Sequence, residues 1–149
     1  MKKLLVLFLS LVLLVASIGI AETAVQTPIL GTQIADGTYP IEVKSSSSMF
    51  RIVDAQLTAK EGSMSAVLTL SGTGYGKLYM GTGEAALTET EDKFIPFIEN
   101  EEGAYTYEVP VEALDVDTDV AAWSIRKETW YDRMLVFESA LIPAEALAK

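Results

Sequence analysis

Apolar and polar residues alternate one by one over much of this chain, and that period of two limits the fold more than any other feature. In a β-strand, successive side chains point to opposite faces, so such a run is typical of a strand with one buried face. The pattern is clearest in two neighbouring runs, 53–59 and 64–70. Glu61 and Gly62 lie between them, so the sequence predicts a tight hairpin with glycine in its turn.

Similar alternation occurs on both sides of this hairpin. It predicts a strand over 38–43, and Pro40 places that strand at a sheet edge because proline has no N–H to donate. A short helix is expected at 83–88, and a fraying one after Pro143. About eight short strands with regular turns predict an all-β fold, either a two-sheet antiparallel β-sandwich or a small barrel. The remaining strands are expected at 77–80, 94–98, 105–109, 120–125 and 133–139.

The first residues have the features of a cleavable secretory signal. Two lysines precede a long apolar run, and small residues, Gly19 and Ala21, stand at the minus-three and minus-one positions of a cleavage site before Glu22. The alternative is a retained membrane anchor, which needs about 18 apolar residues, but serine and glycine interrupt the end of the run. We therefore expect a secreted or cell-surface protein with no membrane span after cleavage.

The rest of the chain reads as one domain with short flanking segments. No periodicity is visible between the cleavage site and Asp36, whereas the alternation begins directly after Asp36-Gly37. The expected organisation is a signal peptide at 1–21, a spacer at 22–35, a β-sandwich domain at 36–140 and a tail at 141–149.

Charge and cysteine content restrict the partners of this domain. Removing residues 1–21 takes away two lysines and leaves 9 basic against 21 acidic side chains, a formal charge of −12. Nucleic acid would be repelled by such a surface, as would an anionic membrane. The chain has no cysteine, so the exported fold depends on its apolar core and not on disulfides.

Catalysis is not expected, because the chain lacks the side chains most often used for it. Histidine and cysteine are both absent, which removes the commonest general base and the thiolate nucleophile. The carboxylates Glu99, Glu101 and Glu102 cluster in one turn, where solubility is the simpler explanation. The sequence therefore favours a binding module over an enzyme.

Three aspartates at alternate positions form a possible cation site. Asp115, Asp117 and Asp119 begin like an EF-hand loop, but the sixth position is Val120 and the twelfth is Arg126, so that motif is rejected. The three carboxylates remain a weak candidate for Ca²⁺, and an ordinary acidic turn is the alternative.

The segment 130–137 is apolar on both of its alternating faces, which is more than one core requires. Such a strand can line a pocket or groove, although aromatic residues also dominate the cores of small all-β domains. Both interpretations stay open on the sequence alone.

Over residues 36–139 the chain resembles the NEAT (near iron transporter) domains of bacterial surface haem-uptake proteins. The resemblance rests on the opening Asp36-Gly37-Thr38-Tyr39, a serine-rich segment ending Ser48-Met49-Phe50, the hairpin at 57–70, and Tyr131-Asp132 at the start of a late apolar strand. It implies an Ig-like β-sandwich.

The resemblance also implies a haem site. Ser45 and Phe50 would belong to a lip over the haem, and Tyr131 would ligate the iron, while Leu135 occupies the place of the family's second tyrosine. The expected haem-binding set is completed by Met49, Trp130 and Met134.

We therefore expect an exported, non-catalytic module that binds haem or another iron compound. The alternative is a cell-surface module without a cofactor, which contacts a protein or glycan through the aromatic hairpin from Trp123 to Leu135.

Overall fold

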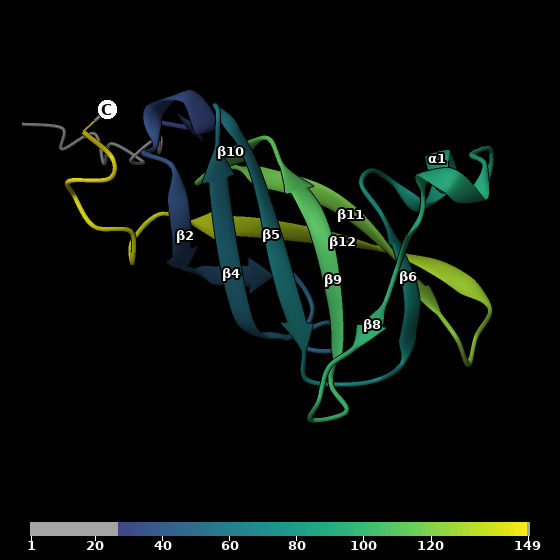
Figure 1. Ribbon diagram of the computed structural model, residues 1–149. Coiled ribbons are helices and arrows are strands. Elements are labelled where there is room, and N and C mark those ends of the chain that lie inside the picture. Colours follow the sequence, from purple (N-terminus) through teal and green to yellow (C-terminus); the bar gives the residue numbers. More distant parts are fainter. Residues whose placement is uncertain (1–26, 149) are drawn as a thin grey trace, which may run out of the picture.

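Two antiparallel five-stranded sheets pack face to face in the computed structural model, which describes residues 27–148 (Figure 1). The β5 sheet has the order β2 (Gly37–Pro40), β4 (Ile52–Lys60), β5 (Ser63–Leu70), β9 (Tyr105–Val111) and β8 (Ile98–Glu99). The β12 sheet has the order β3 (Glu42–Ser45), β12 (Thr129–Glu138), β11 (Asp117–Ser124), β6 (Tyr75–Tyr79) and β7 (Ile95–Pro96). The all-β, Ig-like two-sheet sandwich expected from the sequence is confirmed.

The hairpin between β4 and β5 forms as the alternation predicts. Its strands pair up to Lys60 and Ser63, which leaves a two-residue turn of Glu61 and Gly62. Both turn residues have left-handed backbone, with φ of 51° and 82°. This conformation matches the right-handed twist of paired strands and is easiest for glycine.

At each lateral edge, the chain passes directly from one sheet to the other. The expected strand at 38–43 is divided at Ile41, with β2 before it in the β5 sheet and β3 after it in the β12 sheet. The expected strand at 94–98 is divided in the same way at Phe97, between β7 and β8. Pro40 and Pro96 end the first member of each pair, where a residue without an N–H costs the ladder least. These crossings shorten the edge strands and protect the sheets from edge pairing.

The inward faces of the two sheets form one core. Its largest fully buried side chains are Tyr107, Phe50 and Phe137. The alternating residues of the predicted hairpin supply the β5 side of this core, including Leu57 and Leu68, both with no exposed area. The Tyr107 hydroxyl donates a 2.5 Å hydrogen bond to the carbonyl oxygen of Tyr75 in the other sheet, so this fully buried hydroxyl is satisfied.

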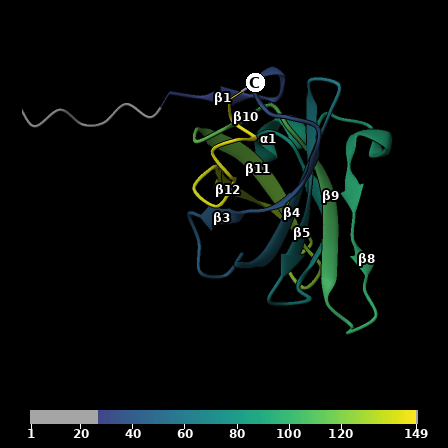
Figure 2. The ribbon, with the colours of Figure 1, turned by 60° about the vertical axis from the view of Figure 1, so that its left-hand side comes forward.

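The two terminal segments of the described chain pack at one end of the sandwich (Figure 2). β1 (Ile29–Leu30) pairs with β10 (Ala113–Leu114), and Ile34, after the 3₁₀ turn Gly31–Gln33, is fully buried. The Ala35 amide donates to the Ala146 carbonyl oxygen at 2.8 Å, and Ile142 is also buried. From Ile29 onward the expected spacer is therefore part of the packed structure, as is much of the expected tail.

Helical structure is limited to short turns. The expected helix appears as α1 (Gly83–Ala86), in which the Thr82 hydroxyl accepts from the Ala85 amide, and a 3₁₀ turn follows at Glu91–Lys93. After Pro143 the chain forms turns instead of the expected helix. Within residues 27–148, no helix is long and apolar enough to cross a membrane. The expected signal peptide lies outside the described residues.

Candidate functional site

A cavity of about 350 Å³ lies at one end of the sandwich, between the serine-rich loop and the turn that joins β11 to β12. It is formed by three parts of the chain that are distant in sequence, around residues 49, 72–75 and 124–133, and the fold brings them together. Its lining combines an exposed methionine, two tyrosines and three basic side chains. The residues that line it are Met49, Gly72, Gly74, Tyr75, Ser124, Arg126, Lys127, Tyr131 and Arg133.

The alternation along β12 decides which of its side chains reach this cavity. Tyr131 and Arg133 lie on the inward face and line the cavity, while Leu135, further along the same face, is fully buried in the core. Along β12, the inward side chains therefore line the cavity first and then enter the core. Trp130 and Met134, at the alternate positions of the same strand, point to the opposite face, away from the cavity.

Arg133 connects the two tyrosines of the cavity. Its Nη2 donates to the Tyr75 hydroxyl at 3.0 Å, and its Nη1 donates to the carbonyl oxygen of Asp132 at 3.0 Å. The guanidinium carbon lies 5.2 Å from the centre of the Tyr131 ring, within the range of a cation–π contact. Its Nε is buried and has no hydrogen-bond partner within residues 27–148.

The serine-rich loop is shaped by its own side chains. The Ser46 amide donates to the Met134 carbonyl oxygen, and the Ser46 hydroxyl accepts from the Met134 amide, both at 2.9 Å. The Ser47 hydroxyl accepts from the Met49 amide at 3.2 Å. These bonds attach the loop to β12 and present the Met49 side chain, which is 75 % exposed, at the cavity.

The turn between β11 and β12 carries two of the basic side chains. The Ser124 hydroxyl accepts from the Lys127 amide at 3.1 Å, and the Ser124 carbonyl oxygen accepts from the Glu128 amide at 2.8 Å. This closes a four-residue turn that places Arg126 and Lys127 at the cavity. Among residues 27–148, no acidic side chain lines the cavity. A cationic site has thus formed on a chain with 21 acidic and 11 basic residues.

The structure places the six residues of the expected haem set in four different environments. Tyr131 and Met49 line the cavity. Phe50 has no exposed area and lies in the core, where its ring meets the Tyr75 ring edge-on at 5.3 Å. Ser45 does not line the cavity either, since its hydroxyl bonds within the loop to Ser47. Trp130 and Met134 lie on the other face of β12.

Several cavity residues were missed by reasoning from the sequence. Arg133 lies two positions after Tyr131 and therefore on the same face of the strand, so strand periodicity alone could have predicted it as a site residue. Tyr75 contributes from β6, and nothing local in the sequence connects it with β12. The glycine-rich segment 71–76 was the available signal, because residues without side chains leave the space beside Tyr75 open. A Cβ at Gly72 or Gly74 would meet no neighbouring atom within 4 Å.

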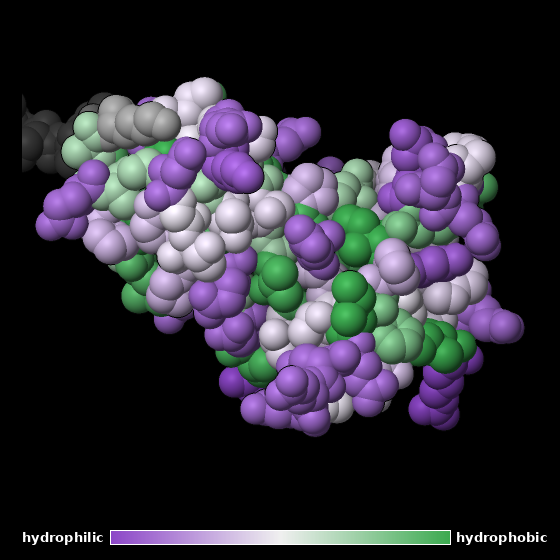
Figure 3. All heavy atoms as spheres, viewed as in Figure 1, coloured by the Kyte–Doolittle hydropathy of each residue, from purple (hydrophilic) through white to green (hydrophobic). Residues whose placement is uncertain are grey.

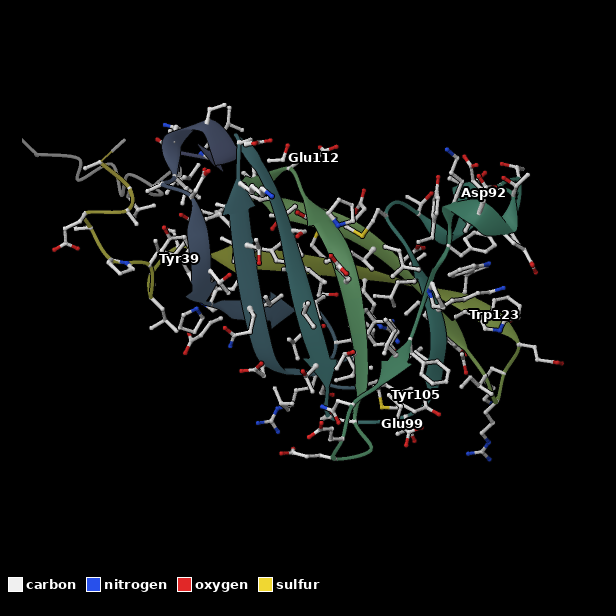
Figure 4. All side chains as sticks on the ribbon, in the orientation of Figure 1. Tyr39, Asp92, Glu99, Tyr105, Glu112 and Trp123 are labelled. Atoms are coloured by element: carbon white, nitrogen blue, oxygen red, sulfur yellow. The ribbon has the colours of Figure 1, made fainter. Side chains whose placement is uncertain are left out.

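Trp130 belongs to an aromatic cluster on the outer face of the β12 sheet. It pairs across the strands with Trp123, and their rings are 5.4 Å apart, while the Phe94 ring lies 4.9 Å from that of Trp130. The Lys77 ammonium lies 4.8 to 5.7 Å from the centres of these three rings. Figure 4 labels Trp123 beside the β11–β12 hairpin. Lys77 is thus within cation–π distance of all three rings.

The opposite, outer face over β4, β5 and β9 shows no continuous apolar surface. Hydrophobic residues appear there as separate patches among hydrophilic ones (Figure 3). Val53 and Val67 are among the exposed apolar residues, at 54 % and 40 %. Scattered apolar residues of this kind are normal on a domain surface and need no partner.

The three aspartates considered for Ca²⁺ do not form a cation site. Asp115 has left-handed backbone, with φ of 62°, and its carboxylate accepts from the amide and hydroxyl of Ser139 at 3.0 and 2.6 Å. Asp117 and Asp119 lie exposed on β11. Residues 27–148 contain no group of three acidic side chains placed to hold a metal ion. Asp115 instead connects the turn between β10 and β11 to Ser139, just after β12. The calcium expectation has no support.

Comparison with known proteins gives information on the fold. No protein-family model matches the chain, and no curated protein matches it. Among solved structures, it is similar to the NEAT5 domain of IsdX2, a B. anthracis hemophore, in complex with heme. The TM-score is 0.53 with 17 % sequence identity, over 72 % of this chain and 100 % of that chain. The chain has a NEAT-like fold. The resemblance read from the sequence is thus confirmed for the NEAT-like architecture, and at this identity the likeness concerns fold alone.

Proposed function

We propose that this protein is an exported, non-catalytic module that binds haem in the cavity between the serine-rich loop and the β11–β12 turn. The observation that carries the proposal is the position of Tyr131, inside a cavity lined by aromatic and basic side chains. The similar NEAT5 domain was solved with heme, which supports haem as the ligand to test first.

The donor set of the chain fits ferric haem. Histidine and cysteine are absent, so tyrosine is the strongest anionic ligand available, and tyrosinate is an established axial ligand of haem iron. Tyr131 would supply the phenolate oxygen. Met49 and the ring of Tyr75 would contact the porphyrin, since both line the same cavity.

The basic side chains fit the acidic groups of haem. Haem carries two carboxylates, and Arg126 and Lys127 project from the turn at the cavity. Charge-assisted hydrogen bonds to carboxylates are stronger than neutral ones. These two residues would fix the orientation of the porphyrin in the cavity.

Titration with hemin tests the proposal. Wild-type protein is expected to give a saturable Soret shift and a high-spin ferric spectrum, which Tyr131→Phe abolishes while the circular dichroism spectrum stays unchanged. Tyr105→Phe is the matched control, because Tyr105 is stacked on Phe97 at 3.8 Å and does not line the cavity. A wild-type protein without a saturable shift, or one unaffected by Tyr131→Phe, would remove haem binding at this site.

The alternative is a protein or glycan contact through the outer aromatic cluster of Trp123, Trp130 and Phe94. Aromatic residues on an uncovered sheet face favour it, but Lys77 already lies over these rings. Trp130→Ala separates the two functions, because this residue lies on the face of β12 opposite Tyr131. The haem proposal predicts unchanged hemin binding in this variant.

A further inference from the structure

We propose that Arg133 is the positioning residue for Tyr131 in the haem site, with Tyr75 holding its guanidinium in place. The inference rests on the proposed haem function and adds a specific role within the site. Arg133 would set the direction of the Tyr131 ring and place a positive charge beside the oxygen that binds the metal.

The guanidinium is fixed at several points. Two of its nitrogens donate hydrogen bonds of 3.0 Å, one to the Tyr75 hydroxyl and one to the Asp132 carbonyl oxygen. Tyr75 is itself only 8 % exposed and packs on Phe50, so this partner is held by the core. The planar arginine fork loses less freedom per hydrogen bond than a flexible lysine would. Arg133 is therefore ordered before a ligand arrives.

Arg133 also lacks a counter-ion. Within residues 27–148 it forms no ion pair, and the neighbouring Asp132 carboxylate points elsewhere, because it accepts a 2.6 Å hydrogen bond from the Gly83 amide on α1. The buried Nε has no partner in the described chain. A partly buried cation without an anion is unfavourable, and a metal-bound phenolate at Tyr131 would supply the missing negative charge.

The position of Arg133 separates it from the other basic residues of the cavity. Arg126 and Lys127 are exposed in the turn, where carboxylates of a ligand can reach them. Arg133 lies on β12, with its guanidinium carbon 5.2 Å from the Tyr131 ring centre and 5.9 Å from that of Tyr75. Leu135, next on the same strand face, has no polar group to offer Tyr131. Arg133 and Tyr75 are thus placed to act on Tyr131 itself.

Two porphyrins distinguish a role in metal ligation from a role in binding carboxylates. Hemin and metal-free protoporphyrin IX have the same ring and carboxylates, but only hemin has a metal for Tyr131 to bind. Arg133→Met keeps most of the side-chain length and removes the charge. We expect it to weaken hemin binding by roughly 10- to 100-fold, the usual loss for a residue that orients a metal ligand, and to shift the ferric charge-transfer band. Protoporphyrin IX binding should change less than about three-fold.

Two further variants test the mechanism. Arg133→Lys should recover part of the hemin affinity, because a positive charge is restored without the planar fork. Tyr75→Phe keeps the ring on Phe50 and removes only the acceptor of the Arg133 hydrogen bond, so a smaller loss for hemin is expected, with the fold intact. Circular dichroism and urea unfolding of each variant measure any effect on folding separately.

The outcomes separate this inference from the haem proposal. If Tyr131→Phe abolishes hemin binding but Arg133→Met leaves both affinity and spectrum unchanged, only the role of Arg133 is wrong. Equal losses for hemin and protoporphyrin IX would also overturn it and assign Arg133 to carboxylate binding or to folding. If wild-type protein binds no hemin, the proposed function itself fails.

Discussion

Phe50→Ala tests whether this residue supports the cavity from the core or acts as part of a lip over the ligand. The Phe50 side chain has no exposed area and meets Tyr75 edge-on at 5.3 Å. Truncating a fully buried phenylalanine costs about 3–5 kcal/mol, of which an aromatic pair contributes about 0.5–1.5 kcal/mol. Since small domains are stable by only about 5–15 kcal/mol, we expect a large fall in the free energy of unfolding.

Urea denaturation, followed by circular dichroism and by fluorescence of Trp123 and Trp130, measures this change. Met49→Ala is the matched control, because Met49 adjoins Phe50 in sequence but is 75 % exposed. This change should alter stability by less than about 0.5 kcal/mol while weakening hemin binding. Phe50→Leu retains most of the volume and should cost about 1–2 kcal/mol. A Phe50→Ala variant that unfolds within about 1 kcal/mol of the wild type, yet loses hemin binding, would refute the assignment of Phe50 to the core.

Three other predictions follow from the structure and the sequence. Burial raises the pKa of Tyr107, so its contribution to stability is complete below the unfolded pKa of about 10 and is lost as pH rises further; alkaline urea titrations should show a fall above about pH 10 that Tyr107→Phe reduces. The double variant Arg126→Gln, Lys127→Gln should weaken hemin and protoporphyrin IX equally and make binding less dependent on salt, as measured by titrations at two ionic strengths. Intact-mass analysis of exported protein should find a first residue of Glu22, and a membrane-embedded species retaining residues 1–21 would contradict the expected signal cleavage.

Local features of the fold were predictable because a strand with one buried face produces an alternation of apolar and polar residues over a short stretch of sequence. The alternation at 53–70 correctly gave both strands of the β4–β5 hairpin, and Glu61-Gly62 correctly gave its turn. Pro40 correctly indicated an edge strand. The short helix expected at 83–88 begins where predicted, as α1, and the Thr82 hydroxyl caps it. Each of these features depends on interactions between residues close in sequence or on the chemistry of a single residue.

The sheet crossings were not predictable from periodicity. Alternation continues through Ile41, yet the chain passes there from one sheet to the other. The Ile41 amide still bonds to the Ala55 carbonyl oxygen of β4 at 3.0 Å, whereas the next residue, Glu42, pairs with Glu138 of β12. The burial of Ile34 likewise depends on the distant segment around Ala146. A pattern along the chain contains no information on which distant strand will become its neighbour.

The resemblance predicted individual residues of the candidate site but not the arrangement of the site. It pointed to Tyr131 and Met49, which the cavity brings together, and also to Trp130 and Met134, which strand alternation should have placed on the other face. Tyr75 could not have been found, because its link to the site is a hydrogen bond with Arg133, 58 positions along the chain. Sites built from several strands depend on register, which the sequence does not reveal directly.

The central claim is that the ligand binds in the inner cavity at Tyr131, and tyrosine-selective NMR tests it directly. The chain has six tyrosines, and gallium protoporphyrin IX can replace hemin as a diamagnetic probe with a trivalent metal. We predict the largest chemical-shift changes at Tyr131 and Tyr75, with Tyr39 and Tyr105 unaffected. Tyr79 reports on the outer aromatic cluster, since its ring lies 6.0 Å from that of Phe94. A spectrum in which Tyr79 changes most, or in which Tyr131 does not change at saturation, would contradict the proposed site.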